Sequence, residues 1–245
     1  MSLHVKNRIK YYFLQIGRFL LLIFSINYRK ENKRLRNEIQ KLKAKRFLNI
    51  DEAYNLDYFK STPFIEEQKY AMNISQVVCE VFKPKSVVDV GCGKGLFLDF
   101  FYKKGIKIKG YEGSGSAIKL FVLPRKYVEK VDLRKQIKTS KHYDVAISWE
   151  VAEHIEKEFV AVYITNLIKL SNTIVFTAAE PFLNPPHPHH PNEQFSEYWD
   201  ELFKFFDYKK NTILTNKLQN ELIHIGLPPR LEYYTGMKVY THEKK

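Results

Sequence analysis

The chain has 245 residues, of which 44% are hydrophobic, which suits one α/β domain with an appended segment and excludes a disordered polymer. The formal net charge of +13 is concentrated in residues 1–47, which contain 13 Lys and Arg but only Glu31 and Glu38 as acids, so residues 48–245 carry a net charge of +2. Because the body of the chain is nearly neutral, nucleic acid is not an expected partner, and its two cysteines exclude a disulfide framework.

The first predicted element is a basic and apolar helical arm over residues 1–47. Residues 11–28 are mostly apolar or aromatic and have basic residues on both sides. A transmembrane helix needs about 20 mostly apolar residues, whereas Gln15 and Arg18 interrupt this stretch. We expect the segment to lie in the membrane interface, which would place the protein in the cytoplasm at the inner face of the membrane. The alternative is a helix that packs on residues 48–245 or on a second copy of the chain.

The clearest motif lies in residues 86–95, which read S-V-V-D-V-G-C-G-K-G. The apolar run 87–90 predicts a buried strand of a parallel sheet, and residues 96–101 have the periodicity of a helix. The glycines between them allow a tight turn and a close approach to a ligand. Such a unit presents backbone N–H groups at a helix start beyond the strand ends. The glycine spacing does not match the G-x-G-x-x-G dinucleotide fingerprint.

Further strands and helices alternate along the rest of the chain. We predict a Rossmann-like, doubly wound α/β fold with about seven mostly parallel strands, preceded by a lead-in helix over residues 63–82. The second domain is expected to span residues 48–245. The further predicted strands are residues 106–112, 128–132 and 174–177, and residues 143–150 are a strand with its loop. Residues 210–215 and 238–241 are candidates for the late strands, and the G-L-P-P sequence of residues 226–229 interrupts regular structure between them.

The D-x-G-x-G-x-G pattern of residues 89–95 resembles motif I of class I S-adenosylmethionine-dependent methyltransferases, and the resemblance covers roughly residues 50–240. It implies an enzyme with this fold and with S-adenosylmethionine as cofactor. The resemblance assigns Asp89 to organising the loop and Asp132 to the adenine amino group, while Glu112 is placed to accept both ribose hydroxyls. The expected cofactor-binding residues are Asp89, Gly91, Cys92, Gly93, Gly95, Glu112, Asp132, Trp149 and Glu150.

Two later segments resemble the active-site half of the family. Residues 149–155 resemble an E-V-x-E-H segment, in which Glu153 and His154 are expected to open a helix; capping and catalysis are equally plausible roles there. Residues 178–195 contain five prolines and three histidines, which predicts a stiff loop outside the core. Its H-H-x-N-E-Q-x-x-x-Y-W signature, together with residues 54–59, is similar to a bacterial and archaeal-type group that is associated with surface-glycan and secondary-metabolite assembly.

Methyl transfer from a sulfonium requires alignment of donor and acceptor and the removal of one proton. An imidazole is suited to that task at neutral pH, so His189 or His190 is the predicted base. The candidate catalytic residues are His189, His190, Glu150 and His154. The candidate acceptor-binding residues, which offer hydrogen bonds or rings for a polyhydroxylated molecule, are His187, Asn192, Glu193, Gln194, Tyr198 and Trp199.

These observations predict an O-methyltransferase that acts on a saccharide or lipid-linked saccharide and needs no metal. One alternative comes from the small-RNA 3′-end methyltransferases, which bind a divalent metal through a Glu-x-x-His and two later histidines. The match is loose, because Glu150 lies four residues before His154 and Glu153 is adjacent to it. An RNA 2′-O-methyltransferase and a non-catalytic, membrane-tethered scaffold therefore remain alternatives.

Overall fold

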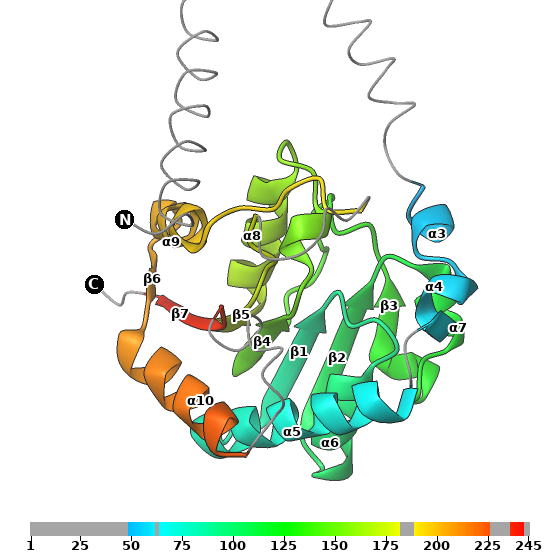
Figure 1. The fold of residues 1–245 in the computed structure, drawn as a ribbon, viewed down its shortest axis with the longest axis horizontal. Helices are drawn as coiled ribbons and strands as arrows, with labels where there is room; N and C mark the ends of the chain where they lie inside the picture. The colour runs from blue at the N-terminus through cyan, green and yellow to red at the C-terminus, as the bar shows by residue number, and fades with distance from the viewer. Residues whose placement is uncertain (1–48, 62–63, 182–188, 226–235, 243–245) are drawn as a thin grey trace, which may run out of the picture. The chain divides into compact units, whose positions relative to one another are not determined.

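The computed structural model describes residues 49–61, 64–181, 189–225 and 236–242. They form a seven-stranded sheet in the order β3-β2-β1-β4-β5-β7-β6, which confirms the predicted Rossmann-like sheet (Figure 1). β7 is antiparallel to β5 and β6, and the other neighbouring strands are parallel. The strands are β1 (Ser86–Val90), β2 (Lys107–Glu112), β3 (Val128–Lys130), β4 (Val145–Ser148), β5 (Thr173–Phe176), β6 (Tyr208–Lys210) and β7 (Lys238–His242).

Helices cover both faces of the sheet (Figure 1). Side chains of α5, α6 and α10 pack in the hydrophobic cluster on one face, and side chains of α8 and α9 pack in the cluster on the other. The predicted lead-in helix corresponds to α5. The helices are α3 (Ile50–Ala53), α4 (Leu56–Ser61), α5 (Phe64–Phe82), α6 (Leu96–Lys103), α7 (Gly115–Lys119), α8 (Val160–Leu170), α9 (Ser196–Phe205) and α10 (Thr212–His224).

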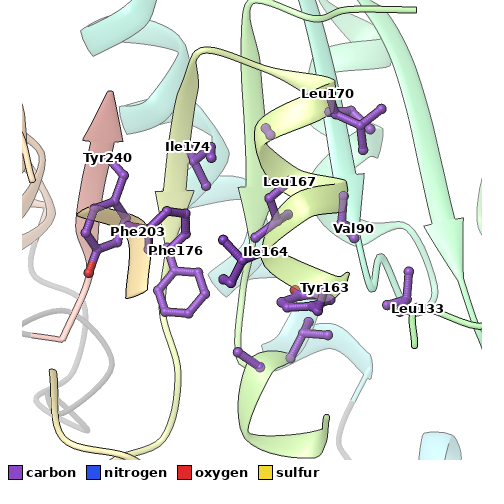
Figure 2. Packing of buried hydrophobic residues seen from close by; sticks show 14 of the residues in the cluster. Val90, Leu133, Tyr163, Ile164, Leu167, Leu170, Ile174, Phe176, Phe203 and Tyr240 are labelled. Carbon is purple, nitrogen blue, oxygen red and sulfur yellow. The ribbon is translucent and has the colours of Figure 1, made fainter. Parts of the chain in front are cut away.

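The strands are apolar because both of their faces are buried. Successive strand residues point to opposite faces, so Val88 and Val90 of β1 join the cluster beneath α8 whereas Val87 joins the cluster beneath α5. In the same way, Phe176 of β5 packs on the α8 side and Val175 on the α5 side. Figure 2 shows the α8 cluster, in which helix side chains meet those of the strands. This two-sided core fixes the strand ends from which the candidate site is built.

One predicted strand is wrong. Residues 210–215 were expected to form a late strand, but β6 ends at Lys210 and α10 begins at Thr212. The side chain of Asn211 accepts a hydrogen bond from the backbone N–H of Leu214 at 3.0 Å, which caps the new helix. A cap of this kind ends the strand and starts the helix within one residue, and it overrides the β-propensity of the following Ile213.

Several predicted features lie outside the described residues. They are the arm of residues 1–47, His187 and the predicted interruption of regular structure at residues 226–229. Within the described part of the chain, no helix combines the length and apolar character needed to cross a bilayer.

Candidate active site

The glycine loop between β1 and α6 has three glycines in the left-handed region, with φ values of 86° for Gly91, 52° for Gly93 and 80° for Gly95. A Cβ atom on Gly91 would lie 2.5 Å from the side chain of Val151, and one on Gly95 would lie 2.3 Å from the ring of Phe121. At Gly93 the nearest atom to such a Cβ is 4.0 Å away. Gly91 and Gly95 therefore permit close packing, whereas Gly93 leaves open space beside the loop.

Glu112 ties the end of β2 to this loop. Its Oε2 accepts a hydrogen bond from the backbone N–H of Gly93 at 2.7 Å, and its Oε1 accepts one from Ser114 at 2.7 Å. Burial raises the pKa of the carboxyl group, while these backbone donors oppose the rise. A carboxylate has about four lone-pair sites and three backbone donors contact this one, from Gly93, Gly113 and Ser114, so it can hold the loop and still accept from a ligand.

Asp89 is the other buried acid beside the loop. It is 2% exposed, and its Oδ2 has no hydrogen-bond partner among the described residues. Burial and, to a smaller extent, the charge of Glu112 together raise the pKa of Asp89 to about 8. A buried carboxyl group without a partner is costly, so a cationic or hydrogen-bonding ligand at this position would be stabilised by it.

A cavity of about 270 Å³ lies against the glycine loop. This volume is close to the lower end of the ~300–1,000 Å³ of small-molecule sites. The wall includes five predicted cofactor residues, namely Asp89, Gly91, Cys92, Gly93 and Trp149. It does not include the other predicted cofactor residues, Gly95, Glu112, Asp132 and Glu150.

Part of the cavity wall comes from residues that no motif marked as ligand-binding. They belong to α4, α5, the loop itself and the start of α6. The sequence offered one signal for a ligand contact among them, which is Lys94. A lysine within a glycine loop places a charge where the backbone approaches a ligand. These residues are Tyr58, Phe59, Glu67, Tyr70, Ala71, Lys94, Leu96 and Phe97.

A second group of polar residues follows β4. Glu150 has a φ of 52°, an unusual conformation for a residue other than glycine, and its backbone N–H donates to Thr177 Oγ1 at 2.9 Å. Burial raises the pKa values of Glu150 and Glu153, and the charge of Glu150 raises that of Glu153 further. Glu153 and His154 were expected to open a helix, but they form a single 3₁₀ turn, and α8 begins only at Val160. Glu153, in the turn, is fully buried, whereas Glu150 precedes the turn and is partly buried.

Two imidazole rings lie beside these carboxyl groups. His154 Nδ1 is 2.8 Å from the backbone oxygen of His189 and 2.7 Å from the hydroxyl of Tyr54. His190 Nδ1 is 2.9 Å from Glu193 Oε1, and the rings of His154 and His190 are 4.6 Å apart between centroids. A carbonyl or carboxylate oxygen only accepts, so in the neutral form of each ring Nδ1 carries the proton and Nε2 carries the lone pair.

Three of these groups could hold a metal ion. Ligand atoms of Glu153, His154 and His190 all lie within 4.8 Å of one another. In the described part of the structure, the buried Oε2 of Glu153 has no hydrogen-bond partner. Carboxylate and imidazole donors suit divalent cations, and ligating histidines usually donate their other N–H to an oxygen, as both do here.

Tyr54 connects this second group to the cavity. Its ring lies 5.2 Å from that of Tyr58, which is part of the cavity wall, and 5.3 Å from that of His154. On the β4 side, Trp149 lines the cavity and is followed directly by Glu150. Two separate segments of the chain therefore link the carboxyl and imidazole group to the cavity wall.

Comparison with known proteins decides the family. A family model described as a methyltransferase domain matches residues 65–212, more than half of the chain. The chain belongs to this family. As a member, it is an S-adenosylmethionine-dependent methyltransferase. No curated protein matches the sequence.

Solved methyltransferase structures share the fold. The plantazolicin methyltransferase BpumL, in complex with a pentazolic desmethylPZN analog and SAH, is similar over 84% of this chain and 99% of its own, with a TM-score of 0.53 and 18% identity. The methyltransferase domain of bacterial-CtHen1-C is similar over 73% of this chain and 99% of its own, with a TM-score of 0.52 and 19% identity. At such identities the similarity concerns the fold alone.

A methyltransferase needs a site for its cofactor, and the cavity against the glycine loop is the candidate. Gly93 leaves the loop open to a ligand, and Asp89 presents an unsatisfied buried oxygen in the same wall. Asp132, which resembled the adenine-contacting residue, is held at the end of β3 by Arg134, whose Nε donates to Oδ1 at 2.8 Å. Its predicted role stays a prediction.

The structure places several predicted acceptor residues elsewhere. Asn192 and Gln194 are 1% and 4% exposed, so the loop that contains them is partly core, contrary to expectation. Asn192 Nδ2 donates to the backbone oxygen of Ala152 at 3.4 Å, and Gln194 Nε2 donates to Asn192 Oδ1 at 3.0 Å. Both amides hold the loop against the 3₁₀ turn, because buried polar groups need partners. They are not free to bind an acceptor in this structure.

One aromatic residue of the signature, Trp199, is also part of the core. Trp199 is 2% exposed and its ring lies 5.2 Å from that of Phe176 in the core, so it cannot stack on a sugar in this structure. Tyr198 is half-buried against Trp199. Of the predicted acceptor residues, Glu193 contacts a predicted catalytic histidine, since its Oε1 lies 2.9 Å from His190 Nδ1.

Proposed function

We propose that this methyltransferase transfers a methyl group to a hydroxyl of a saccharide or lipid-linked saccharide in surface-glycan assembly. The observation that carries the proposal is the pair of imidazoles, His154 and His190, whose Nδ1 atoms are held by oxygen acceptors beside the cavity. A hydroxyl that receives a methyl group must lose its proton, and an oriented neutral imidazole is a suitable base.

The chain's own residues have separate tasks in this proposal. Bound S-adenosylmethionine supplies an electrophilic methyl group, and the glycine loop with Asp89 holds the donor. His190 removes the acceptor proton through Nε2, and Glu193 orients its ring and stabilises the imidazolium that forms. His154, Glu150 and His189 line the same region and position the acceptor.

The acceptor class is supported by the sequence signature and by charge. The H-H-x-N-E-Q-x-x-x-Y-W signature resembles a group associated with surface glycans, and residues 48–245 have a net charge of only +2. The arm of residues 1–47 would hold the enzyme at the cytoplasmic face of the membrane, close to lipid-linked acceptors. Methyl-ether analysis of surface glycans from a deletion strain tests the proposal: one methylated sugar should disappear and return on complementation.

A second candidate is a metal-dependent RNA 2′-O-methyltransferase, and the cluster of Glu153, His154 and His190 favours it. This candidate expects activity to vanish on chelation and to return with Mg²⁺ or Mn²⁺. It also expects strong, salt-sensitive RNA binding, which the nearly neutral body does not favour. Activity on a saccharide that survives chelation would exclude it. The family assignment argues against the remaining alternative, a non-catalytic scaffold, and turnover of S-adenosylmethionine by the purified protein tests it directly.

A further inference from the structure

The cavity wall contains an ion pair that the proposed mechanism does not use. Glu67 lies near the start of α5 and Lys94 lies in the glycine loop between Gly93 and Gly95. Lys94 Nζ contacts Glu67 Oε2 and also donates to the backbone oxygen of Phe59 at 3.1 Å. The lysine side chain is 7% exposed and the glutamate side chain 27% exposed, so the pair is mostly withdrawn from water.

The position of this pair points to a ligand. A buried ion pair contributes little to stability, because desolvating its charges costs about as much as the attraction between them returns. The turn does not need a charge either, since its unusual backbone angles are carried by Gly91, Gly93 and Gly95. Glu67 and Lys94 both line the cavity, so a bound molecule can reach the pair without unfolding the wall.

The charges of the wall match those of the cofactor. Among the described residues that line the cavity, Lys94 is the one cation, and the acids are Asp89 and Glu67. S-adenosylmethionine carries one carboxylate, at its amino-acid end, and two positive groups, the ammonium beside it and the sulfonium. The wall therefore offers one cation for the one carboxylate of the cofactor, and two acidic side chains for its two positive groups.

We propose that Glu67 and Lys94 form the receptor for the zwitterionic amino-acid end of the cofactor, and this proposal rests on the cavity being the cofactor site. Lys94 pairs with the carboxylate of the ligand and Glu67 with its ammonium group. In the free protein the two side chains pair with each other, and in the complex each pairs with the opposite charge of the ligand. No buried charge is therefore left unpaired before or after binding. The pair thereby selects ligands that carry an intact amino acid.

The alternative is a plain structural clamp between α5 and the loop. A clamp contributes equally to the binding of every ligand that needs the loop in place. A receptor contributes only to ligands that carry the amino-acid end. S-adenosylhomocysteine and 5′-methylthioadenosine separate the two, because both contain the adenosyl thioether but only the first contains the amino acid.

The test is calorimetric titration of both ligands into the full chain and its variants. We expect Glu67→Gln and Lys94→Met each to weaken S-adenosylhomocysteine binding about ten- to a hundredfold, the range of one charge-assisted hydrogen bond. Affinity for 5′-methylthioadenosine should stay within about threefold, as that ligand lacks both charged groups. Exposed Glu80→Gln on α5 and Lys104→Met after α6 serve as matched controls and should change neither affinity.

Removing one charge can destabilise the fold by leaving the other buried and unpaired. The double variant Glu67→Gln with Lys94→Gln removes both, and its melting temperature shows whether it is folded. Equal losses for the two ligands in a folded variant would overturn the receptor and support the clamp. An unmutated protein that binds both ligands equally would also overturn it. An unmutated protein that binds neither would contradict the cofactor site itself, and the receptor with it.

Discussion

Tyr54 and His154 lie 100 residues apart in the sequence, and their side chains meet, with 2.7 Å between the Tyr54 hydroxyl oxygen and His154 Nδ1. The same hydroxyl lies 3.4 Å from the backbone oxygen of His189. Tyr54 directly follows α3, while the two histidines belong to segments after β4 and β5. The short N-terminal helices of the domain therefore help to orient an imidazole of the candidate active site.

The first prediction concerns this contact. Tyr54→Phe keeps the ring and removes the hydroxyl, so His154 loses one partner of its Nδ1. We expect kcat to fall about tenfold and the free energy of unfolding to fall by about 1 kcal/mol, while affinity for S-adenosylhomocysteine stays unchanged. Tyr102→Phe, at an exposed position on α6, is the matched control. A loss of cofactor affinity equal to the loss of rate would contradict a role confined to the acceptor side.

The second prediction concerns the base. His190→Gln should lower kcat by about 10²- to 10⁴-fold, the usual contribution of a general base, with little change in cofactor affinity. Glu193→Gln should lower it less, since the ring remains but loses the carboxylate that orients it. His224→Gln on the exposed end of α10 should have no effect. Unchanged turnover by His190→Gln would transfer the role to another residue.

The third prediction is a pH dependence set by Asp89. Its pKa of about 8 means that the carboxyl group is mostly protonated below that pH in the free protein. A nearby sulfonium favours the ionised form and lowers the pKa, so S-adenosylmethionine must displace a proton in order to bind. Affinity should therefore rise as pH increases towards 8, by up to about tenfold per unit, and then level off.

S-adenosylhomocysteine lacks the sulfonium charge and serves as the control ligand for this experiment. Its affinity should depend less on pH over the same interval, and Asp89→Asn should remove the difference between the two ligands. Parallel pH profiles for both ligands in the unmutated protein would mean that Asp89 does not respond to the sulfonium.

The fourth prediction separates two glycines of the loop. Both have positive φ values, which cost another residue about 1 kcal/mol, but a Cβ on Gly95 would also lie 2.3 Å from the Phe121 ring. Gly95→Ala should therefore lower the free energy of unfolding by roughly 2–4 kcal/mol. Gly93→Ala should cost only about 1 kcal/mol of stability but should weaken cofactor binding, because its Cβ enters open space on the cavity wall. Denaturant unfolding and ligand titration on both variants measure the two effects.

The sheet and the glycine loop were predictable because their signals are local. Residues 87–90 are apolar since both faces of β1 are covered, and Gly91 to Gly95 form a motif within one turn of chain. The prediction of a strand at residues 210–215 was wrong for a reason that is also local. Ile213 has a high β-propensity, but the cap formed by Asn211 starts a helix at this point.

The rest of the candidate site depends on contacts between distant segments. Glu67 meets Lys94 and Tyr54 meets His154 only after α3, α4 and α5 pack against the loop and the 3₁₀ turn. Polar residues such as Asn192 were expected to face an acceptor, since the sequence does not reveal which side a loop presents to the interior. These contacts are set by the tertiary packing of segments far apart in the chain, and local sequence patterns do not predict that packing.

Titration of S-adenosylhomocysteine into the full chain tests the central claim most directly, with Gly93→Ala and His190→Gln measured alongside. The account predicts saturable binding at one site, weakened about tenfold or more by Gly93→Ala and unaffected by His190→Gln. Absence of saturable binding to the unmutated protein, or equal binding to Gly93→Ala, would contradict a cofactor site at the glycine loop.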